Sequence, residues 1–303
     1  MDIANLYEEL SALVPGSKLK MHEPLKTHVY TQMGGTADLW AEPASYAEIE
    51  RIVAYAKERS LPLTVLGNGS NVIIRDGGVR GIVLQTSGLE HIRTEGQWVV
   101  AQCGAKIIDV SRYALEQRLS GLEFACGIPG TVGGALYMNA GAYGGEVKDV
   151  LHSALAVDPE GRIIELTANE LAFGYRKSLF SGGEYVVLEA RFALTPGDPA
   201  VIKAKMDDLT FQRESKQPLE YPSCGSVFKR PPGRFAGQLI QESGLQGTRI
   251  GGAEVSRKHA GFIINADNAT AKDYIGLIQH VRETVNGKFG VMLETEVEII
   301  GEE

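Results

Sequence analysis

"CGIPGTVGGALYMNAGAYGGE", residues 126–146, contains seven glycines among its 21 positions. A core strand or helix needs side chains to pack, and this composition supplies few of them. Pro129 stiffens the segment. Gly130, Gly133 and Gly134 carry no side chain. We therefore predict a loop whose backbone runs along an extended ligand. A tightly packed structural turn is the alternative interpretation.

A second glycine-containing loop is "LGNGSNVIIR" at 66–75. It lacks the third glycine of the GxGxxG fingerprint and leads into a strand, so it does not fit a Rossmann dinucleotide site. A nest of backbone N–H groups could bind phosphate there, with Ser70 and Asn71 as further donors. A plain hairpin turn, which the Asn-Gly pair favours, is the alternative. Two such loops without a Walker lysine indicate a dinucleotide cofactor.

The composition is ordinary for a soluble globular protein, with 44% apolar and 22% charged residues. The 303 residues suffice for two or three packed units. A net charge of -8 argues against general nucleic-acid binding. No apolar run approaches the roughly 18 to 20 residues that span a bilayer, and the acidic N-terminus does not resemble a signal peptide. We expect no membrane insertion.

The cysteines and histidines bear on metal binding and location. Cys103, Cys126 and Cys224 are far apart and odd in number, which is typical of reduced thiols in the cytoplasm. The six histidines show no HxxxH or HxH spacing, and there is no CxxC. We therefore expect a cytoplasmic protein without a structural metal.

The order of elements predicts an α+β chain without repeats. Helices are expected at 2–14, after Ser45, at about 106–119, at about 199–215 and at 270–287, with capping boxes at Ser45/Glu48 and Thr270/Asp273. Short β-type runs lie between them, and the alternating run "VMLETEVEII" at the end of the chain predicts a strand. The break at 196–199 is the clearest domain boundary.

One further stretch, "YPSCGSVFKRP" at 221–231, places Cys224 and Ser226 among small residues and just before two cations. No histidine and acid pair with the serine as in a hydrolase triad. Arg176 in "GYRKS" could clamp a carboxylate with two parallel N–H bonds, although a surface arginine is the plainer interpretation. For Glu296, among the alternating acids of the final run, a solvated strand face is the plainer interpretation.

Six motifs occur in order along the chain: "GNGSN", "GIPGTVGGALYMNAGAYG", "YRKSLF", "SCGSVFKRP", "IGGAEVS" and "LETEVEIIG". Together they resemble the UDP-N-acetylenolpyruvoylglucosamine reductases, flavoenzymes that make UDP-N-acetylmuramate for peptidoglycan. The resemblance extends from about residue 25 to 301. The compact segment from Tyr175 to Ser226 is similar to the shorter class, which lacks an inserted substrate-covering loop.

The resemblance implies a two-part FAD-binding region of the vanillyl-alcohol-oxidase type and a C-terminal α+β substrate-binding domain. The corresponding bounds are 1–197, with parts at about 1–88 and 89–197, and 198–303, whose last strand carries Glu296. It further implies noncovalent FAD, NADPH as co-substrate and a UDP-sugar as substrate. We expect a monomer or a weak oligomer.

The resemblance also assigns roles. Hydride from reduced FAD adds to C3 of the enolpyruvyl group, Ser226 protonates C2, and Arg176 and Glu296 stabilise the enolate. Substrate contacts are assigned to Tyr175, Arg213, Lys216, Lys229 and Arg230, a set whose cations suit a pyrophosphate. Arg230 and Gln246 depart from the residues common in other members. The residues assigned to the cofactor are Gly67, Asn68, Gly69, Ser70, Asn71, Gly127, Ile128, Pro129, Gly130, Thr131, Gly133, Gly134, Ala135 and Asn139.

Two other functions compete with this one. A flavin oxidase of the same superfamily would use O₂, and many such enzymes tether FAD through a histidine, which the segments 66–90 and 121–146 lack. A flavin-carrying binding protein without turnover is the second alternative, although Arg176, Ser226 and Glu296 are all in place. Cys224 is interpreted as a small buried filler with no part in the chemistry.

Overall fold

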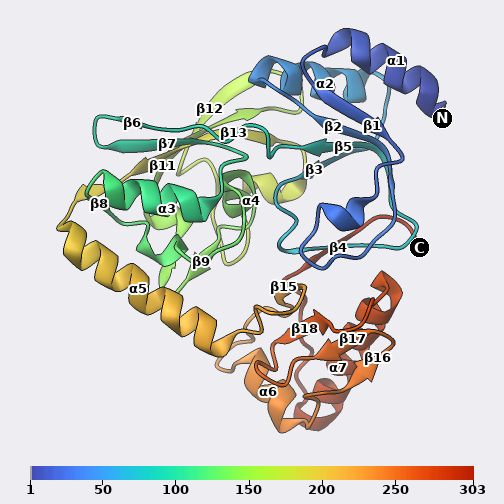
Figure 1. The fold of residues 1–303 in the computed structure, drawn as a ribbon, viewed down its shortest axis with the longest axis vertical. Coiled ribbons are helices and arrows are strands. Elements are labelled where there is room, and N and C mark those ends of the chain that lie inside the picture. The colour runs from blue at the N-terminus through green and yellow to red at the C-terminus, as the bar shows by residue number, and fades with distance from the viewer. Residues whose placement is uncertain (1) are drawn as a thin grey trace. The chain divides into compact units, whose positions relative to one another are not determined.

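The computed structural model describes residues 2–303, which form two compact units (Figure 1). Unit 1 comprises the chain up to Glu23, Asp38–Asn68 and Gly81–Gln212; unit 2 comprises Pro24–Ala37, Gly69–Arg80 and Arg213–Glu303. The change at Arg213 falls inside helix α5 (Pro199–Lys216), beyond the predicted break at 196–199. The functional domains 1–197 and 198–303 stay a prediction.

Unit 1 is built on two sheets (Figure 1). The four-stranded sheet has the order β1 (Lys18–Met21), β2 (Ala37–Glu42), β5 (Val79–Gln85) and β3 (Leu63–Leu66). The antiparallel five-stranded sheet has the order β12 (Ile163–Thr167), β11 (Leu151–Val157), β13 (Val186–Ala193), β7 (Trp98–Gln102) and β6 (Ile92–Glu95). Two short ladders pair β9 (Gly141–Ala142) with β10 (Gly145–Glu146) and β8 (Leu119–Ser120) with β14 (Thr195–Pro196).

The helices of unit 1 are α1 (Ile3–Leu13), α2 (Tyr46–Glu58), α3 (Ile107–Glu116) and α4 (Val132–Tyr137), with 3-10 turns at Glu123–Ala125, Val147–Asp149 and Leu179–Gly182. Asp2 caps α1 as predicted. Ser45 caps α2 by accepting from the Glu48 N–H. The predicted capping box is nevertheless incomplete, because the Glu48 carboxylate accepts from Gly16 N–H and Ala44 N–H, each at 2.8 Å. The bonds to Gly16, which is distant in sequence, and to Ala44 replace the expected bond between the Glu48 carboxylate and the Ser45 N–H. One buried apolar cluster joins these helices to both sheets.

Unit 2 pairs the antiparallel strands β15 (Ser223–Ser226), β18 (Phe262–Asn265), β17 (Ala253–Val255) and β16 (Arg249–Ile250). Its helices are η1 (Leu25–Thr27), α6 (Ala236–Glu242) and α7 (Ala271–Phe289), and β4 (Val72–Ile74) pairs in parallel with β19 (Glu298–Ile300). The capping box of Thr270 and Asp273 opens α7 as predicted. Its buried face (Tyr274, Leu277, Ile278, Val281 and Val285) forms the core of the unit together with residues of β17 and β18.

Two predicted bounds in unit 2 are wrong. Helix α7 continues through Gly287 to Phe289, and Gly290 ends it in the left-handed conformation at φ 66°. The buried apolar face extends to Val285 and stabilises the last turns of the helix. A Cβ on Gly287 would meet no neighbouring atom, so no contact at this glycine requires the helix to end there. The final strand begins only at Glu298, so Glu296 precedes it. Residues 291–297 form backbone bonds with irregular segments and no continuous ladder.

None of the helices within residues 2–303 combines the length and the apolar character that crossing a bilayer requires.

Candidate active site

The two glycine loops meet in unit 1. The side-chain amide of Asn68 donates to the backbone oxygen of Pro129 at 2.7 Å. A Cβ atom on Gly67 would collide with Thr131 Oγ1. Position 67 therefore needs glycine for this close approach. The two contacts place residues 67–68 of one loop beside residues 129–131 of the other.

The plain hairpin interpretation of the loop at 66–75 is wrong. Strand β3 before the loop pairs with β5, whereas β4 after it pairs with β19 in a different sheet. A hairpin turn must join two paired strands. Gly69 adopts φ +61°, and a Cβ there would collide with the backbone of His28 and Val29. The loop is thus shaped by packing, and its role as a phosphate nest stays a prediction.

The glycine-rich segment also contains a helix that the composition did not predict. Thr131 caps α4, whose Val132, Ala135 and Leu136 are buried on one face. Two interior glycines cost about 1 kcal/mol each relative to alanine. Burying Val132 and Leu136 contributes about 1.5–3 kcal/mol each, which outweighs that cost. Close packing adds a reason for glycine, since a Cβ on Gly133 would lie only 3.3 Å from Cys103 O.

Two observations in unit 1 fit a bound cofactor. Gln85 Nε2 donates to Gly67 O at 2.8 Å, while Gln85 Oε1 is buried and finds no donor within residues 2–303. A buried acceptor without a partner is costly, and a ligand hydroxyl or N–H would satisfy it. Gly134 is exposed on an otherwise buried helix, and a Cβ there would meet only Thr131 Oγ1, at 3.6 Å. Gln85 was missed because a single glutamine closing an apolar strand carries no distinctive sequence signal.

The other cofactor residues predicted in unit 1 differ in accessibility. The segment from Gly127 to Gly130 is partly exposed, whereas Ala135 belongs to the buried face of α4. Asn139 is fully buried, and its side-chain amide bonds to protein groups. Any contact of Asn139 with a cofactor is therefore left to its backbone.

Arg176 stands at the corner of a tight turn in unit 1. Gly174 and Lys177 exchange backbone hydrogen bonds of 2.9 and 3.3 Å. Arg176 adopts φ 55° at the third position of this turn, where glycine is common. Its Nη2 donates to Gly141 O at 3.0 Å, and its guanidinium lies 5.1 Å from the centroid of the Tyr175 ring. A bulky residue held in a strained conformation is typical of a functional position.

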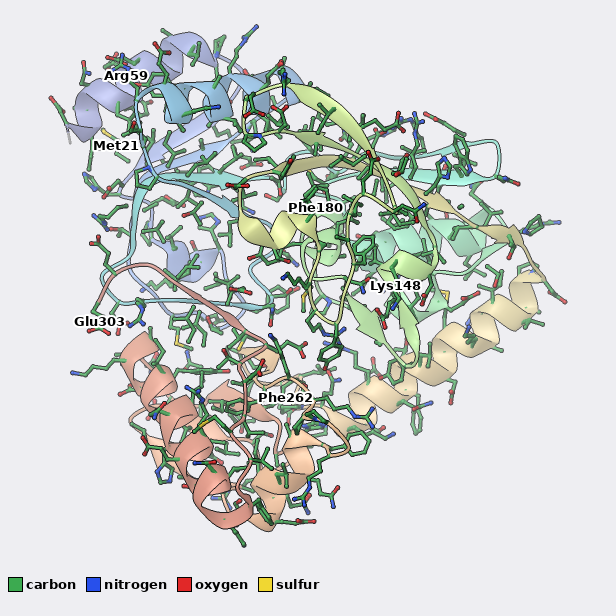
Figure 2. All side chains as sticks on the ribbon, turned by 180° about the vertical axis from the view of Figure 1, so that it is seen from behind. Met21, Arg59, Lys148, Phe180, Phe262 and Glu303 are labelled. Atoms are coloured by element: carbon green, nitrogen blue, oxygen red, sulfur yellow. The ribbon has the colours of Figure 1, made fainter. Side chains whose placement is uncertain are left out.

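Ser226 owes its exposure to a β-bulge in unit 2. Ser223 pairs with Ile264 and Ser226 with Phe262, so β15 holds one more residue than its partner. Cys224 is buried, and strict alternation would place Ser226 on the same buried face. The extra residue, with Gly225 at φ +76°, turns Ser226 to the exposed face instead. Phe262, its partner, is labelled in Figure 2.

Unit 2 also brings Glu296 and Asn71 to this strand. The Glu296 N–H donates to Val227 O at 2.8 Å, one residue from Ser226. The side-chain amide of Asn71 donates to Glu296 O at 3.0 Å, and Asn71 O accepts from the Glu298 N–H at 3.1 Å. A residue predicted for the cofactor thus bonds to Glu296, whose own N–H bonds to the residue that follows Ser226.

The predicted substrate contacts lie in both units. Tyr175 in unit 1 is exposed next to Arg176. In unit 2, Arg213 and Lys216 occupy the last turn of α5, and Lys229 lies 3.5 Å from Glu294 as an ion pair. The Arg230 guanidinium lies 3.9 Å from the centroid of the exposed Phe235 ring.

Cys224 is a buried core residue, as predicted. It is 2% exposed, and its Sγ lies 3.2 Å from the hydroxyl of Tyr274, which in turn donates to Ile263 O at 2.5 Å. Burial raises the pKa of the Cys224 thiol to about 12. The thiol is therefore protonated near neutral pH and is a poor nucleophile.

We expect Cys224→Ser to keep activity within about tenfold, because the hydride and proton transfers that the resemblance implies need no nucleophilic sulfur. A serine hydroxyl can still bond to Tyr274. Steady-state turnover, flavin content and thermal melting of this variant are to be compared with those of Cys126→Ser, a second buried thiol. A loss as deep as that of Ser226→Ala, in a folded variant with its flavin bound, would refute the filler role.

The chain is similar to known proteins in its domains, in its whole sequence and in its fold. Residues 37–167 match the family described as "FAD binding domain", and residues 217–300 match "UDP-N-acetylenolpyruvoylglucosamine reductase, C-terminal domain". A reductase of this name from Exiguobacterium sibiricum is 62% identical over 301 residues, covering 99% of this chain and 98% of the relative. One from Staphylococcus aureus (strain COL) is 58% identical over 298 residues, covering 98% and 97%.

A solved structure extends the likeness to the fold. The crystal structure of UDP-N-acetylenolpyruvylglucosamine reductase from Thermus caldophilus superposes with a TM-score of 0.81 at 33% identity, covering 94% of this chain and 99% of that one. The predicted α+β fold, with an FAD-binding region followed by a C-terminal domain of this family, is confirmed. Identity of this level across nearly the whole length establishes that the chain belongs to the UDP-N-acetylenolpyruvoylglucosamine reductase family.

Proposed function

We propose that this reductase uses NADPH and noncovalent FAD to convert the enolpyruvyl group of UDP-N-acetylglucosamine-enolpyruvate to a lactyl ether. The product, UDP-N-acetylmuramate, serves peptidoglycan synthesis. The observation that carries the proposal is the junction in unit 2, where Ser226, Glu296 and Asn71 lie on adjoining backbone segments. A proton donor, an enolate-stabilising acid and a cofactor residue then belong to one site.

The cofactor site is assigned to residues of both loops. Gly134 leaves room at the start of α4, and Gln85 Oε1 supplies a buried acceptor beside Gly67. The predicted set (Gly67, Asn68, Gly69, Ser70, Asn71, Gly127, Ile128, Pro129, Gly130, Thr131, Gly133, Gly134, Ala135 and the backbone of Asn139) stays our proposal for FAD. FAD reduced by NADPH supplies the hydride that C3 of the enolpyruvyl group receives.

Three side chains of this chain carry the remaining chemistry. Addition of hydride at C3 leaves an electron pair at C2, delocalised into the attached carboxylate. The guanidinium of Arg176 can hold that carboxylate by two parallel N–H bonds. The Ser226 hydroxyl donates the proton to C2 and regains one from solvent, to which Ser226 is exposed. Hydride and proton together complete the two-electron reduction. Glu296 is the further side chain that we assign to stabilisation of the enolate.

The cationic residues of unit 2 suit the diphosphate of the substrate. Arg213 and Lys216 end α5, while Lys229 and Arg230 follow Ser226 in sequence. In a chain of net charge -8, four cations within 18 positions form a local site for an anion. Tyr175 completes the proposed substrate contacts. The three free cysteines support a reducing compartment, and we place the enzyme in the cytoplasm as a monomer or weak oligomer.

Turnover distinguishes this function from the alternatives. Under anaerobic conditions the purified protein should oxidise NADPH in an amount equal to the added enolpyruvyl sugar nucleotide, and the lactyl product should appear by mass spectrometry. Acid precipitation should leave the flavin in the supernatant. An oxidase would instead consume NADPH with O₂ in the absence of the sugar nucleotide. A binding protein would bind FAD and produce no lactyl product.

A further inference from the structure

The side chain of Asn139 is fully buried, and both its amide nitrogen and its carbonyl oxygen form hydrogen bonds within one small region of unit 1. Its Nδ2 donates to Glu146 Oε2 at 2.5 Å and to Gly174 O at 3.0 Å. Its Oδ1 accepts from the N–H of Lys148 at 3.0 Å. Lys148 is labelled in Figure 2. A buried amide with every group satisfied fixes its surroundings in one arrangement.

The position of these bonds connects two functional elements. Asn139 directly follows α4 and its capping residue Met138, at the end of the helix that carries the exposed Gly134. Gly174 opens the turn whose corner is Arg176. A second bond, from Arg176 Nη2 to Gly141 O, joins the arginine side chain to strand β9 in the same region. The hairpin of β9 and β10 is thereby fastened to the arginine turn at two points.

Both ends of this arrangement are strained. Arg176 has φ 55° and Asn139 has φ 43°, values at which residues other than glycine are uncommon. A strained turn relaxes unless surrounding contacts over-determine it. The bond from Asn139 Nδ2 to Gly174 O is such a contact. The same Nδ2 also donates to the negatively charged Glu146 carboxylate, and this charge-assisted bond holds the amide in place.

We propose that Asn139 is a positioning residue, which holds the Gly174–Lys177 turn so that the Arg176 guanidinium is presented in a single orientation. The inference rests on the proposed function, in which Arg176 clamps the substrate carboxylate. Asn139 itself touches no reacting atom. Its side chain acts through Arg176 alone, so its contribution disappears when Arg176 is absent.

A double-mutant cycle tests this dependence. Asn139→Gly removes the amide without adding strain, because glycine tolerates φ 43°. We expect the reoxidation of reduced enzyme by enolpyruvyl substrate to slow about 100-fold, the size of effect that a misplacement of about 1 Å produces. Flavin content and flavin reduction by NADPH should stay within about twofold of the parent protein. In the Arg176→Ala background, Asn139→Gly should slow reoxidation no further.

Two further variants complete the experiment. Asn139→Asp keeps the acceptor for the Lys148 N–H but loses both donors, so it should be as slow as Asn139→Gly. Asn268→Gly is the control, because Asn268 also has positive φ, at 49°, but is exposed, and it should leave every rate unchanged.

Each outcome decides the proposal. Equal losses from Asn139→Gly with and without Arg176 would overturn it, and so would loss of FAD or of folding in both Asn139 variants. Equal losses would show that the Asn139 side chain acts independently of Arg176. Loss of FAD or of folding would show that it serves cofactor binding or the fold. If Arg176→Ala alone left reoxidation intact, the proposed function would fail at Arg176, a result separate from the coupling measured in the cycle.

Discussion

Ser226→Ala should separate the two half-reactions of the enzyme. Flavin reduction by NADPH is expected to proceed at nearly the parental rate, because that step requires no proton at C2. Reoxidation by the enolpyruvyl substrate should slow by about 10²–10⁴-fold, the usual contribution of a positioned proton donor. The bulge at Gly225 turns Ser226 to the exposed face, so removing its hydroxyl leaves the buried packing of Cys224 and Val227 unchanged.

Stopped-flow measurement of flavin absorbance reports each half-reaction separately. Ser223→Ala is the matched control: it removes a hydroxyl from the same strand, three residues earlier, and should affect neither rate. Parallel loss of both half-reactions in Ser226→Ala would show that the substitution acts through folding or binding. The role of Ser226 as proton donor would then lose its support.

The local signals in the sequence predicted the beginnings of elements better than their ends. Asp2, Ser45 and Thr270 cap their helices as expected, because an N-cap bond depends on a few neighbouring residues. Gly287 did not end α7, since the buried face of that helix outweighs the preference of one glycine. Likewise, the alternation around Glu296 did not produce a strand before Glu298, because the backbone there bonds to Val227 and Asn71 instead.

The candidate site residues received their roles from the resemblance and not from short motifs alone. The residues "SCGS" left Cys224 and Ser226 open, the resemblance favoured Ser226, and the burial of Cys224 agrees with that choice. The bulge that exposes Ser226 depends on pairing with Ile264 and Phe262, which are distant in sequence. For the same reason the contacts from Asn139 to Gly174 and from Gln85 to Gly67 could not be predicted, since they join segments that only the fold brings together.

Helix α4 shows how composition alone misleads. Its glycines suggested an irregular loop, yet the spacing of Val132, Ala135 and Leu136 is that of a buried helical face. The two interpretations are compatible once the glycines are considered one by one. Gly133 lies against the backbone of Cys103, whereas Gly134 faces open space. The first serves packing, and the second leaves room for a ligand.

That distinction makes Gly134→Val a sharp test of the cofactor site. The protein itself leaves room for a Cβ at this position, which would meet only Thr131 Oγ1, at 3.6 Å. Valine also forms helix more readily than glycine, so the melting temperature of the apoprotein should not fall. The space that the valine fills is the space assigned to FAD. Steric overlap of this kind costs about 1–3 kcal/mol or more, so FAD affinity should drop by about fivefold to 150-fold or more.

The expected product is a folded, colourless protein, recognised by its flavin-to-protein absorbance ratio together with its circular dichroism and melting curve. Gly134→Ala should give an intermediate loss of FAD. Gly287→Val is the control, because Gly287 also lies in a helix and a Cβ there meets no atom within 4 Å, although α7 has no assigned cofactor role. If Gly134→Val kept its full flavin content, FAD could not pass the exposed face of α4. The cofactor would then have to be sought elsewhere around Gly67 and Gln85, where the unpaired buried acceptor would still need a donor.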